Sequence, residues 1–199
     1  MSENFYEALK NRRSIYGISK ESSLSDAKIE ELVGFSLKHT PSAFNSQSSK
    51  AVLLLGPEHD KLWDIVMDTL RTKVPADRFG PTETKINGFK SGHGTILYFI
   101  DDRISEGLMA QFPAYADNFH VWAEQANGML QFAIWNALEL EGLGVNLQHY
   151  NPIIDAAVKK TWSLPDSWRL RAQMPFGKPT FKPGEKEFQP LSERLKVFK

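Results

Sequence analysis

Residues 87–101 read NGFKSGHGTILYFID, and the second half of this stretch decides how the chain folds. Its last seven residues, TILYFID, are an almost continuous apolar run of the length that one buried strand needs. Residues 50–56 (KAVLLLG) form a similar run, which Gly56 and the proline after it close. Residues 168–177 (WRLRAQMPFG) read as a further strand. The sequence therefore predicts a sheet with buried strands.

Helices are expected around these strands because apolar residues recur at the spacing of one helix face. Ser25 is placed to cap the helix that Pro41 ends, and Asn151 to cap a short one with Pro152 at its first position. The stretch 75–94 is rich in glycine and proline and is expected to be a loop, and the tail 190–198 to be extended. The helices are expected over residues 3–12, 26–40, 58–72, 116–141 and 151–162.

The alternation of strands and helices predicts an α/β or α+β fold with helices packed on a sheet. No repeat or linker divides the sequence, so we expect one domain over residues 1–199. The apolar positions of 116–141 cover more than one face, which predicts a helix that is central or lies at a subunit interface.

The composition is that of an ordinary soluble protein. The 24 Lys and Arg residues balance the 24 Asp and Glu residues, so no overall basic field favours nucleic acid or anionic lipid. No apolar run approaches the roughly 20 residues that span a bilayer, and the amino terminus lacks a signal-peptide core. We therefore expect a cytosolic protein that binds neither nucleic acid nor membrane.

The residue types narrow the possible chemistry. The chain has no cysteine, which excludes disulfides, thiol nucleophiles and cysteine-ligated metals. The five histidines lie too far apart for a local metal motif, so structural roles are expected for them and no metal site is predicted.

Three polar stretches are candidates for ligand binding. Arg12 and Arg13 beside Ser14 offer forked donors and a hydroxyl to a phosphate. Residues 41–49 (PSAFNSQSS) expose hydroxyls and amides in a turn, and Asn87 with Lys90 precedes a buried strand among glycines. Taken singly, each has an ordinary explanation: a solvated helix end, a polar loop or a surface charge.

The order and spacing of these stretches carry more information than any one of them. Together they resemble the FMN-dependent nitroreductase family, in its branch of fatty-acid-repression-mutant and copper-induced nitroreductases. The resemblance covers nearly the whole chain. Its five motifs are RRSIY (12–16), PSAFNSQ (41–47), EQAN (124–127), GLGVNLQHYN (142–151) and GEKEFQPLSER (184–194).

The resemblance implies an FMN site built from scattered segments. It places Arg12, Arg13, Ser14 and Lys186 at the phosphate and ribityl chain, and Asn87 and Lys90 at the pyrimidine edge of the ring. Residues of the second motif would reach the flavin of the other subunit. These are Ser42, Ala43, Asn45 and Gln47. A backbone N–H near flavin N5 would come from Leu147, Gln148 or His149.

The sequence departs from the family pattern at three places. Tyr16 stands where many relatives have a basic residue near the flavin N1/O2 edge, and Phe188 where they have a second phosphate-binding arginine. His149 and Tyr150 replace a Glu-Gly pair beside N5. Tyr16, Phe44, His149 and Tyr150 are candidates to line the slot beside the flavin, although each is as well explained as core or rim.

The implied fold is α+β, with a central, mostly antiparallel sheet flanked by helices. The implied assembly is an intertwined homodimer whose C-terminal tail extends onto the partner. The implied activity is an NAD(P)H oxidoreductase that passes hydride in a ping-pong cycle from NADH or NADPH to a nitroaromatic or quinone, with the flavin supplying the redox chemistry. Two alternatives stay open: an FMN-binding regulatory or flavin-storage protein with little turnover, and a cofactor-free structural protein.

Overall fold

The computed structural model describes residues 2–199, with side chains described from residue 5 onward, and its centre is an antiparallel sheet. Three strands dominate: β2 (Ser49–Leu55), β3 (Gly94–Asp101) and β5 (Trp168–Pro179). The short strands β1 (Ile18–Ser19) and β4 (Gly144–Val145) both pair with β5, and the strand order is β1-β5-β3-β2. Every pair is antiparallel, which confirms the predicted α+β class.

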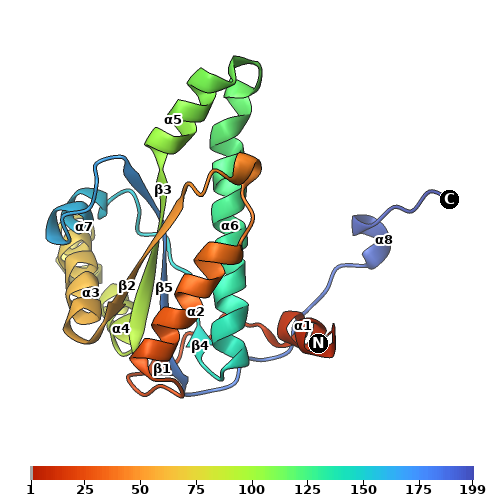
Figure 1. Cartoon of the computed structure of the whole chain (residues 1–199). Coiled ribbons are helices and arrows are strands. Elements are labelled where there is room, and N and C mark those ends of the chain that lie inside the picture. The colour runs from red at the N-terminus through yellow and green to blue at the C-terminus, as the bar shows by residue number, and fades with distance from the viewer. Residues whose placement is uncertain (1) are drawn as a thin grey trace.

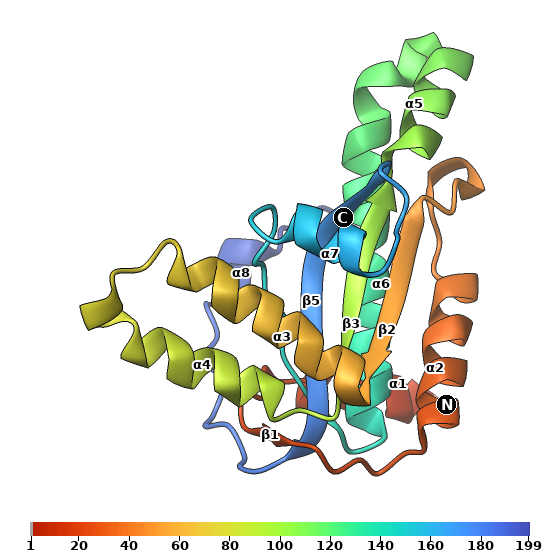
Figure 2. The same cartoon turned by 90° about the vertical axis from the view of Figure 1, so that its left-hand side faces the viewer.

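Helices cover both faces of this sheet. In Figure 2, α3 and α4 lie in front of the strands and α6 lies behind them. The helices are α1 (Ser2–Asn11), α2 (Asp26–His39), α3 (Gly56–Arg71), α4 (Gly80–Lys90), α5 (Asp102–Gln111), α6 (Ala116–Leu140), α7 (Asp155–Thr161) and α8 (Leu191–Arg194). Short 3₁₀ turns span Ala43–Asn45, Ala76–Arg78 and Pro113–Tyr115.

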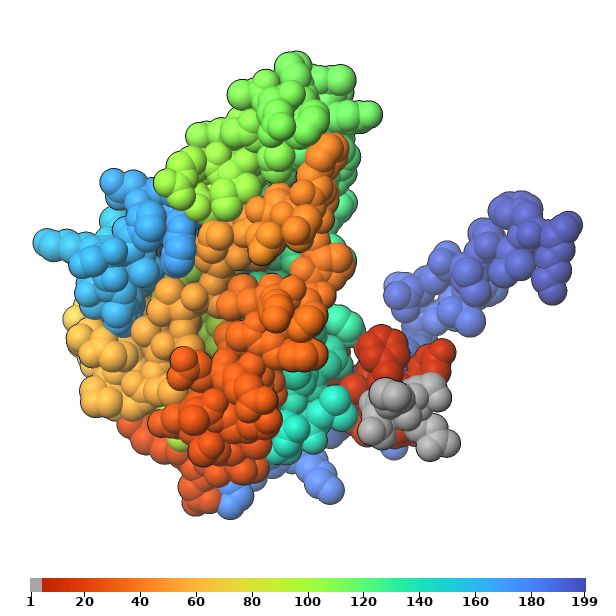
Figure 3. All heavy atoms as spheres, in the orientation of Figure 1, coloured from red at the N-terminus to blue at the C-terminus, as the bar shows by residue number. Residues whose placement is uncertain are grey.

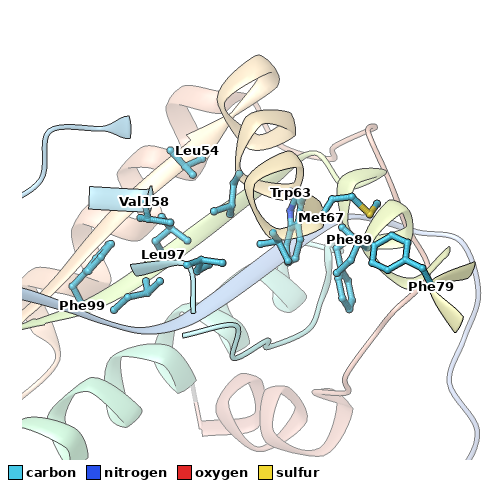
Figure 4. Close-up of a cluster of buried hydrophobic side chains, with 13 residues drawn as sticks. Leu54, Trp63, Met67, Phe79, Phe89, Leu97, Phe99 and Val158 are labelled. Atoms are coloured by element: carbon cyan, nitrogen blue, oxygen red, sulfur yellow. The ribbon is translucent and has the colours of Figure 1, made fainter. Parts of the chain in front are cut away.

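Each face of the sheet has its own core, because successive strand residues point to opposite sides. On the α3 side, Trp63, Leu97 and Phe99 are fully buried in one cluster (Figure 4). On the α6 side, Ile96 and Tyr98 pack in a second cluster with residues of α2 and α6. All eight residues of β3 are buried, so the run in TILYFID is a two-sided buried strand, as predicted.

A chain of buried hydrogen bonds joins α3, β3 and the end of α4. The Trp63 indole N–H donates to Thr95 Oγ1 at 3.0 Å, and that hydroxyl lies 2.9 Å from His59 Nδ1. His59 Nε2 lies 3.1 Å from the carbonyl oxygen of Lys90, so it must be the protonated nitrogen, and Nδ1 accepts from Thr95. Burial lowers the pKa of His59 below its ordinary value. A structural role is therefore confirmed for this histidine.

The long helix α6 lies where the sequence placed it. It crosses the sheet face beside α2 and runs out beyond the strands to pack against α5 (Figure 1). Ile134 and Leu138 are buried on its inner side, while Met129 and Phe132 remain 43% exposed on its outer side. Gly142 follows it with a φ of +83°, the left-handed conformation that ends helices and favours glycine.

Three expectations for local structure were wrong, and one helix, α5, lies in a segment for which the sequence predicted no element. The stretch 75–94, expected to be a loop, contains α4, which has a proline in its first turn. The chain between β3 and α6 forms α5, for which no helix was expected. The helix expected from Asn151 begins only at Asp155, so Asn151 does not cap it. The tail, expected to be extended, includes the single helical turn α8.

The C-terminal segment stands apart from the sheet and its helices. After β5 the chain passes near α1 and then leaves the body of the molecule, as Figures 1 and 3 show. Large apolar side chains along it are open to solvent, with Phe188 78% and Phe198 93% exposed. No helix within residues 2–199 is long and apolar enough to cross a membrane.

Candidate functional site

The segment with the two arginines lies along the short strand β4. Ile15 N donates to the Val145 carbonyl oxygen at 2.8 Å, and Asn146 Nδ2 donates to the Ile15 carbonyl oxygen at 2.9 Å. Asn146 is fully buried, so this contact is a fixed part of the structure. The contact joins two motifs that are about 130 residues apart in the sequence, RRSIY and GLGVNLQHYN.

An open hollow of about 460 Å³ lies between this segment and α6. Arg12, Ser14 and Leu147 line one side of it, which brings together three of the residues expected to hold the cofactor. The α6 side is formed by Gly128, Gln131, Phe132 and Trp135. A Cβ added at Gly128 would meet nothing within 4 Å, so this glycine leaves the helix backbone open to the hollow.

The Arg12 guanidinium packs with its planar face on Trp135, and this contact does not use its N–H donors. Its guanidinium carbon lies 4.7 Å from the centre of the Trp135 ring, a cation–π arrangement. Among residues 5–199, whose side chains are described, no hydrogen bond or ion pair engages the Arg12 guanidinium. The forked donors of this side chain are therefore available to an anion.

Two further cations lie close to Arg12. Arg13 Nη1 donates to the carbonyl oxygen of Gly184, and Lys186 Nζ donates to that of Lys10 at 2.7 Å. Arg13 and Lys186 also line a second hollow, of about 610 Å³, with residues of the tail. Desolvation, followed by the charges of Arg12 and Arg13, lowers the pKa of the Lys186 ammonium. Three of the predicted phosphate ligands thus form one positively charged cluster.

One carboxylate, that of Glu139 on α6, is hydrogen-bonded to the arginine segment beside this cluster. Its Oε2 accepts from the backbone N–H of Arg13 and its Oε1 from the indole N–H of Trp135, both at 2.9 Å. Burial raises the pKa of Glu139, and the two hydrogen bonds and the charges of Arg12 and Lys186 oppose that effect. The carboxylate therefore links the helix, the tryptophan and the arginine segment.

The segment after β4 supplies two backbone donors, on Leu147 and His149, that have no partner among the described residues. The N–H of Gln148 donates to the Gln173 carbonyl oxygen at 2.7 Å, and the N–H of Tyr150 to Gln173 Oε1 at 2.7 Å. Between them, the N–H of His149 has no partner among the described residues. Partial desolvation, with a smaller effect from the charge of Arg171, lowers the pKa of the His149 imidazole. Of the candidates near flavin N5, Leu147 and His149 therefore have free backbone donors, and Leu147 lines the hollow with Arg12 and Ser14.

Tyr16 and Lys90 lie at the other end of the arginine segment. The Tyr16 ring is 6.4 Å from that of Phe89 on α4, and it is 53% exposed. Asn87 and Lys90 occupy the last turn of α4, and the Lys90 ammonium forms an ion pair with Asp64 of α3. The sequence placed these residues on a loop; the helix instead fixes their spacing, and Lys90 already has one counter-charge.

The loop from Ser42 to Gln47 lies elsewhere in this chain. Ser42 and Gln47 line a small pocket with Ala126 and Leu130 of α6. Gly128 faces the Arg12 hollow and is two residues from Ala126, about 200° around the helix, so the two sites lie on opposite sides of α6. Within one chain the structure does not bring Ser42, Ala43, Asn45 or Gln47 to the Arg12 hollow.

This loop is also conformationally unusual. Phe44, Asn45 and Gln47 have positive φ values of 56°, 49° and 51°, which non-glycine residues rarely adopt. Ser42 Oγ accepts from the Gln47 backbone N–H at 3.0 Å and closes the turn. The Phe44 ring lies 5.0 Å from that of Phe112 and forms an aromatic cluster with residues of α6. Such strain concentrates at binding sites.

Sequence reasoning missed the α6 side of the hollow. Gly128, Gln131 and Trp135 recur at intervals of three and four residues, so they share one helix face. This pattern alone is equally typical of a subunit interface. No pattern in the sequence identifies Glu139 as part of the site, because its hydrogen-bond partner Arg13 is 126 residues away.

Known proteins resemble this chain in sequence and in fold. The chain is 39% identical to HBN1 of Saccharomyces cerevisiae over 186 residues, which cover 92% of each protein. Nitroreductase CinD from Lactococcus lactis, solved in complex with chloramphenicol and with 4-nitrophenol, is 42% identical, with a TM-score of 0.90 over 98% of this chain and all of that one. A protein from Desulfovibrio desulfuricans, solved in complex with FMN, shares the fold at 20% identity, with a TM-score of 0.71 over 97% and 96% of the two chains. Residues 9–178 match the model of the nitroreductase family, and the chain belongs to that family.

Proposed function

We propose that this protein is an FMN-dependent NAD(P)H oxidoreductase that reduces nitroaromatic or quinone acceptors as a homodimer. The observation that carries the proposal is the cluster of Arg12, Arg13 and Lys186 beside an open hollow, with the donors of Arg12 unused. In a chain with no net charge, such a local concentration of cations indicates a dianionic ligand.

The residues present fit the parts of FMN. Arg12 and the neighbouring Lys186 would hold the phosphate with charge-assisted hydrogen bonds, and the Ser14 hydroxyl is exposed in the hollow that Arg12 lines. Because Gly128 carries no side chain, α6 leaves room for a flat ring system, and the free backbone N–H of Leu147 or of His149 would donate to its edge. Asn87 and Lys90 at the end of α4 would serve the pyrimidine edge.

The proposed homodimer explains why the predicted site is divided in one chain. Ser42 and Gln47 lie on the opposite side of α6 from Arg12, so their loop, with Asn45, would reach only the flavin held mainly by the other subunit. The dimer would also cover the apolar side chains on the outer side of α6 and along the tail. These are Val121, Met129, Phe132, Leu140, Phe188, Leu191, Leu195, Val197 and Phe198.

FMN, when bound, supplies the hydride chemistry, so the protein has to bind the cofactor, orient the substrate against it and stabilise the charge on its ring. The ammonium of Lys90 would stabilise negative charge at the N1/O2 edge, and the Arg12 cluster would fix the opposite end of the cofactor. The described residues contain no dinucleotide-binding domain, so donor and acceptor would take turns in one slot. Tyr16, Phe44, His149 and Tyr150 remain the proposed lining of that slot.

Aromatic acceptors are the proposed substrate class. CinD, at 42% identity, has been solved with chloramphenicol and with 4-nitrophenol, which are both nitroaromatic compounds. The exposed aromatic rings of Tyr16 and Phe44 suit flat substrates.

The test is steady-state oxidation of NADH and of NADPH by the FMN-loaded protein, with 4-nitrophenol or a quinone as acceptor. Parallel lines in a double-reciprocal plot support a ping-pong cycle. A yellow protein that neither donor bleaches would contradict the proposal and favour a flavin-storage role. A protein that takes up no FMN would contradict both.

A further inference from the structure

We infer that Glu139 is a positioning residue for the cofactor phosphate: through Trp135 and the backbone of Arg13, it holds the Arg12 guanidinium where it can bind that group. The inference rests on the proposed FMN site and adds a consequence to it. Glu139 would be a source of the preference for FMN over riboflavin, which has the same ring system but no phosphate.

The contacts form one continuous path. Trp135 donates to Glu139 Oε1 one helical turn further along α6, and this bond fixes the orientation of the indole ring. The face of that ring carries the Arg12 guanidinium at 4.7 Å. The other oxygen, Oε2, accepts the backbone N–H of the next residue, Arg13. Glu139 therefore restrains Arg12 from the side-chain end and from the backbone end.

Glu139 does not line the hollow of Arg12, Ser14 and Leu147, although with Arg12 it lines a separate hollow of about 290 Å³. It acts through its neighbours, so its removal leaves every proposed cofactor contact chemically intact. An arginine side chain loses much of its rotamer freedom when it is fixed. A guanidinium that is already held against Trp135 has lost part of that freedom before the ligand binds, and binding is correspondingly tighter.

The negative charge of Glu139 acts in the opposite direction, because a carboxylate repels a phosphate. Glu185 lines the hollow of Arg13 and Lys186, so the three cations Arg12, Arg13 and Lys186 face two carboxylates, and the cluster stays positive with Glu139 in place. Both oxygens of the Glu139 carboxylate are also occupied by N–H donors. The two effects give opposite signs for removal of the charge: positioning predicts weaker FMN binding, and repulsion predicts tighter binding.

The test compares Glu139→Gln with Glu141→Gln, measuring the Kd of the apoprotein for FMN and for riboflavin by quenching of flavin fluorescence. Glutamine has one carbonyl oxygen and can accept only one of the two N–H groups. Glu141 follows the same helix end and takes no part in the Arg12 contacts, so its substitution removes the same charge. We expect Glu139→Gln to weaken FMN binding by up to about ten-fold, because Arg12 would then lose its conformational freedom only when the ligand binds, with riboflavin binding unchanged. Glu141→Gln should change neither.

Each other outcome decides against the inference. Equal loss of FMN and riboflavin would show a general structural defect, and tighter FMN binding would show that the carboxylate only repels. If Glu141→Gln weakens FMN binding as much as Glu139→Gln does, Glu139 acts only through the overall charge of the protein. If the Glu139 variant does not fold, Trp135→Phe keeps the ring but removes its donor, and it must also lose FMN selectively. A wild-type protein that binds flavin but does not prefer FMN overturns the inference alone, whereas one that binds no flavin overturns the proposed function as well.

Discussion

Replacement of Arg12 by alanine tests whether the cation cluster binds the phosphate of FMN. The Arg12 guanidinium rests on Trp135 at 4.7 Å and has no partner for its donors among residues 5–199. Its loss removes a charge-assisted hydrogen bond but leaves Arg13 and Lys186 in place. Apoprotein stability should change little, because in the free protein the guanidinium only stacks on Trp135, and a cation–π interaction at an exposed site contributes about 0.5–1 kcal/mol.

The expected effect on FMN is larger. A hydrogen bond to a charged group contributes about 1.5–3 kcal/mol, and each 1.4 kcal/mol is a factor of ten in affinity. The Kd for FMN should therefore rise by about 10- to 150-fold in Arg12→Ala, while that for riboflavin stays unchanged. Fluorescence titration of the apoprotein with each flavin measures both values.

A matched control is Arg78→Ala, which removes the same charge from the exposed 3₁₀ turn Ala76–Arg78. It should leave the affinity for FMN unaltered. The reasoning is refuted if Arg12→Ala purifies with a full complement of FMN, or if it loses riboflavin and FMN to the same degree.

Three further predictions concern the rest of the molecule. Burial lowers the pKa of His59 in the folded state, so the unfolded state binds the proton more readily. The free energy of unfolding should therefore fall by up to about 1.4 kcal/mol per pH unit as the pH drops below about 6.5. Chemical denaturation at several pH values measures this, and His59→Gln should show a weaker dependence on pH. Lys90→Ala should lower the midpoint potential of the bound flavin, and an unchanged potential in spectroelectrochemical titration would remove the role assigned to that lysine. Gly177→Ala would bring a Cβ to 2.1 Å from the Ser19 carbonyl oxygen, so it should destabilise the protein by about 1–3 kcal/mol or more, as a thermal melt would show.

The strands were predictable because their signal is local. An apolar run such as 95–101 has to be buried on both sides, whatever lies around it, and the antiparallel class followed from the family resemblance. The long helix was predictable for the same reason, since Ile134 and Leu138 are buried at helical spacing. The boundaries of these elements agree with the expectation to within a few residues.

The misassigned segments have a physical explanation. Gly80 and Pro81 were taken as loop residues, but proline is favoured in the first turn of a helix, where its missing N–H costs nothing. Asn151 has the chemistry of a helix cap, yet its side chain instead accepts from Gln173 Nε2 at 3.3 Å. Local preference was overridden there by a contact with β5, which the sequence does not reveal.

The candidate site was predictable only in part. Arg12, Arg13 and Lys186 were named from their motifs, and the structure gathers them. Trp135 and Glu139 were not, because their roles depend on contacts between α6 and the amino-terminal segment, more than a hundred residues apart. The separation of Ser42 from Arg12 across α6 is also a property of the folded chain alone.

The most direct measurement is the absorbance spectrum of the purified, FMN-reconstituted protein before and after anaerobic addition of NADH or NADPH, followed by 4-nitrophenol. The account predicts flavin bands at one FMN per chain, their loss on addition of the nicotinamide and their return on addition of the acceptor. A protein that holds no FMN after reconstitution, or whose flavin bands persist under both donors, would contradict it.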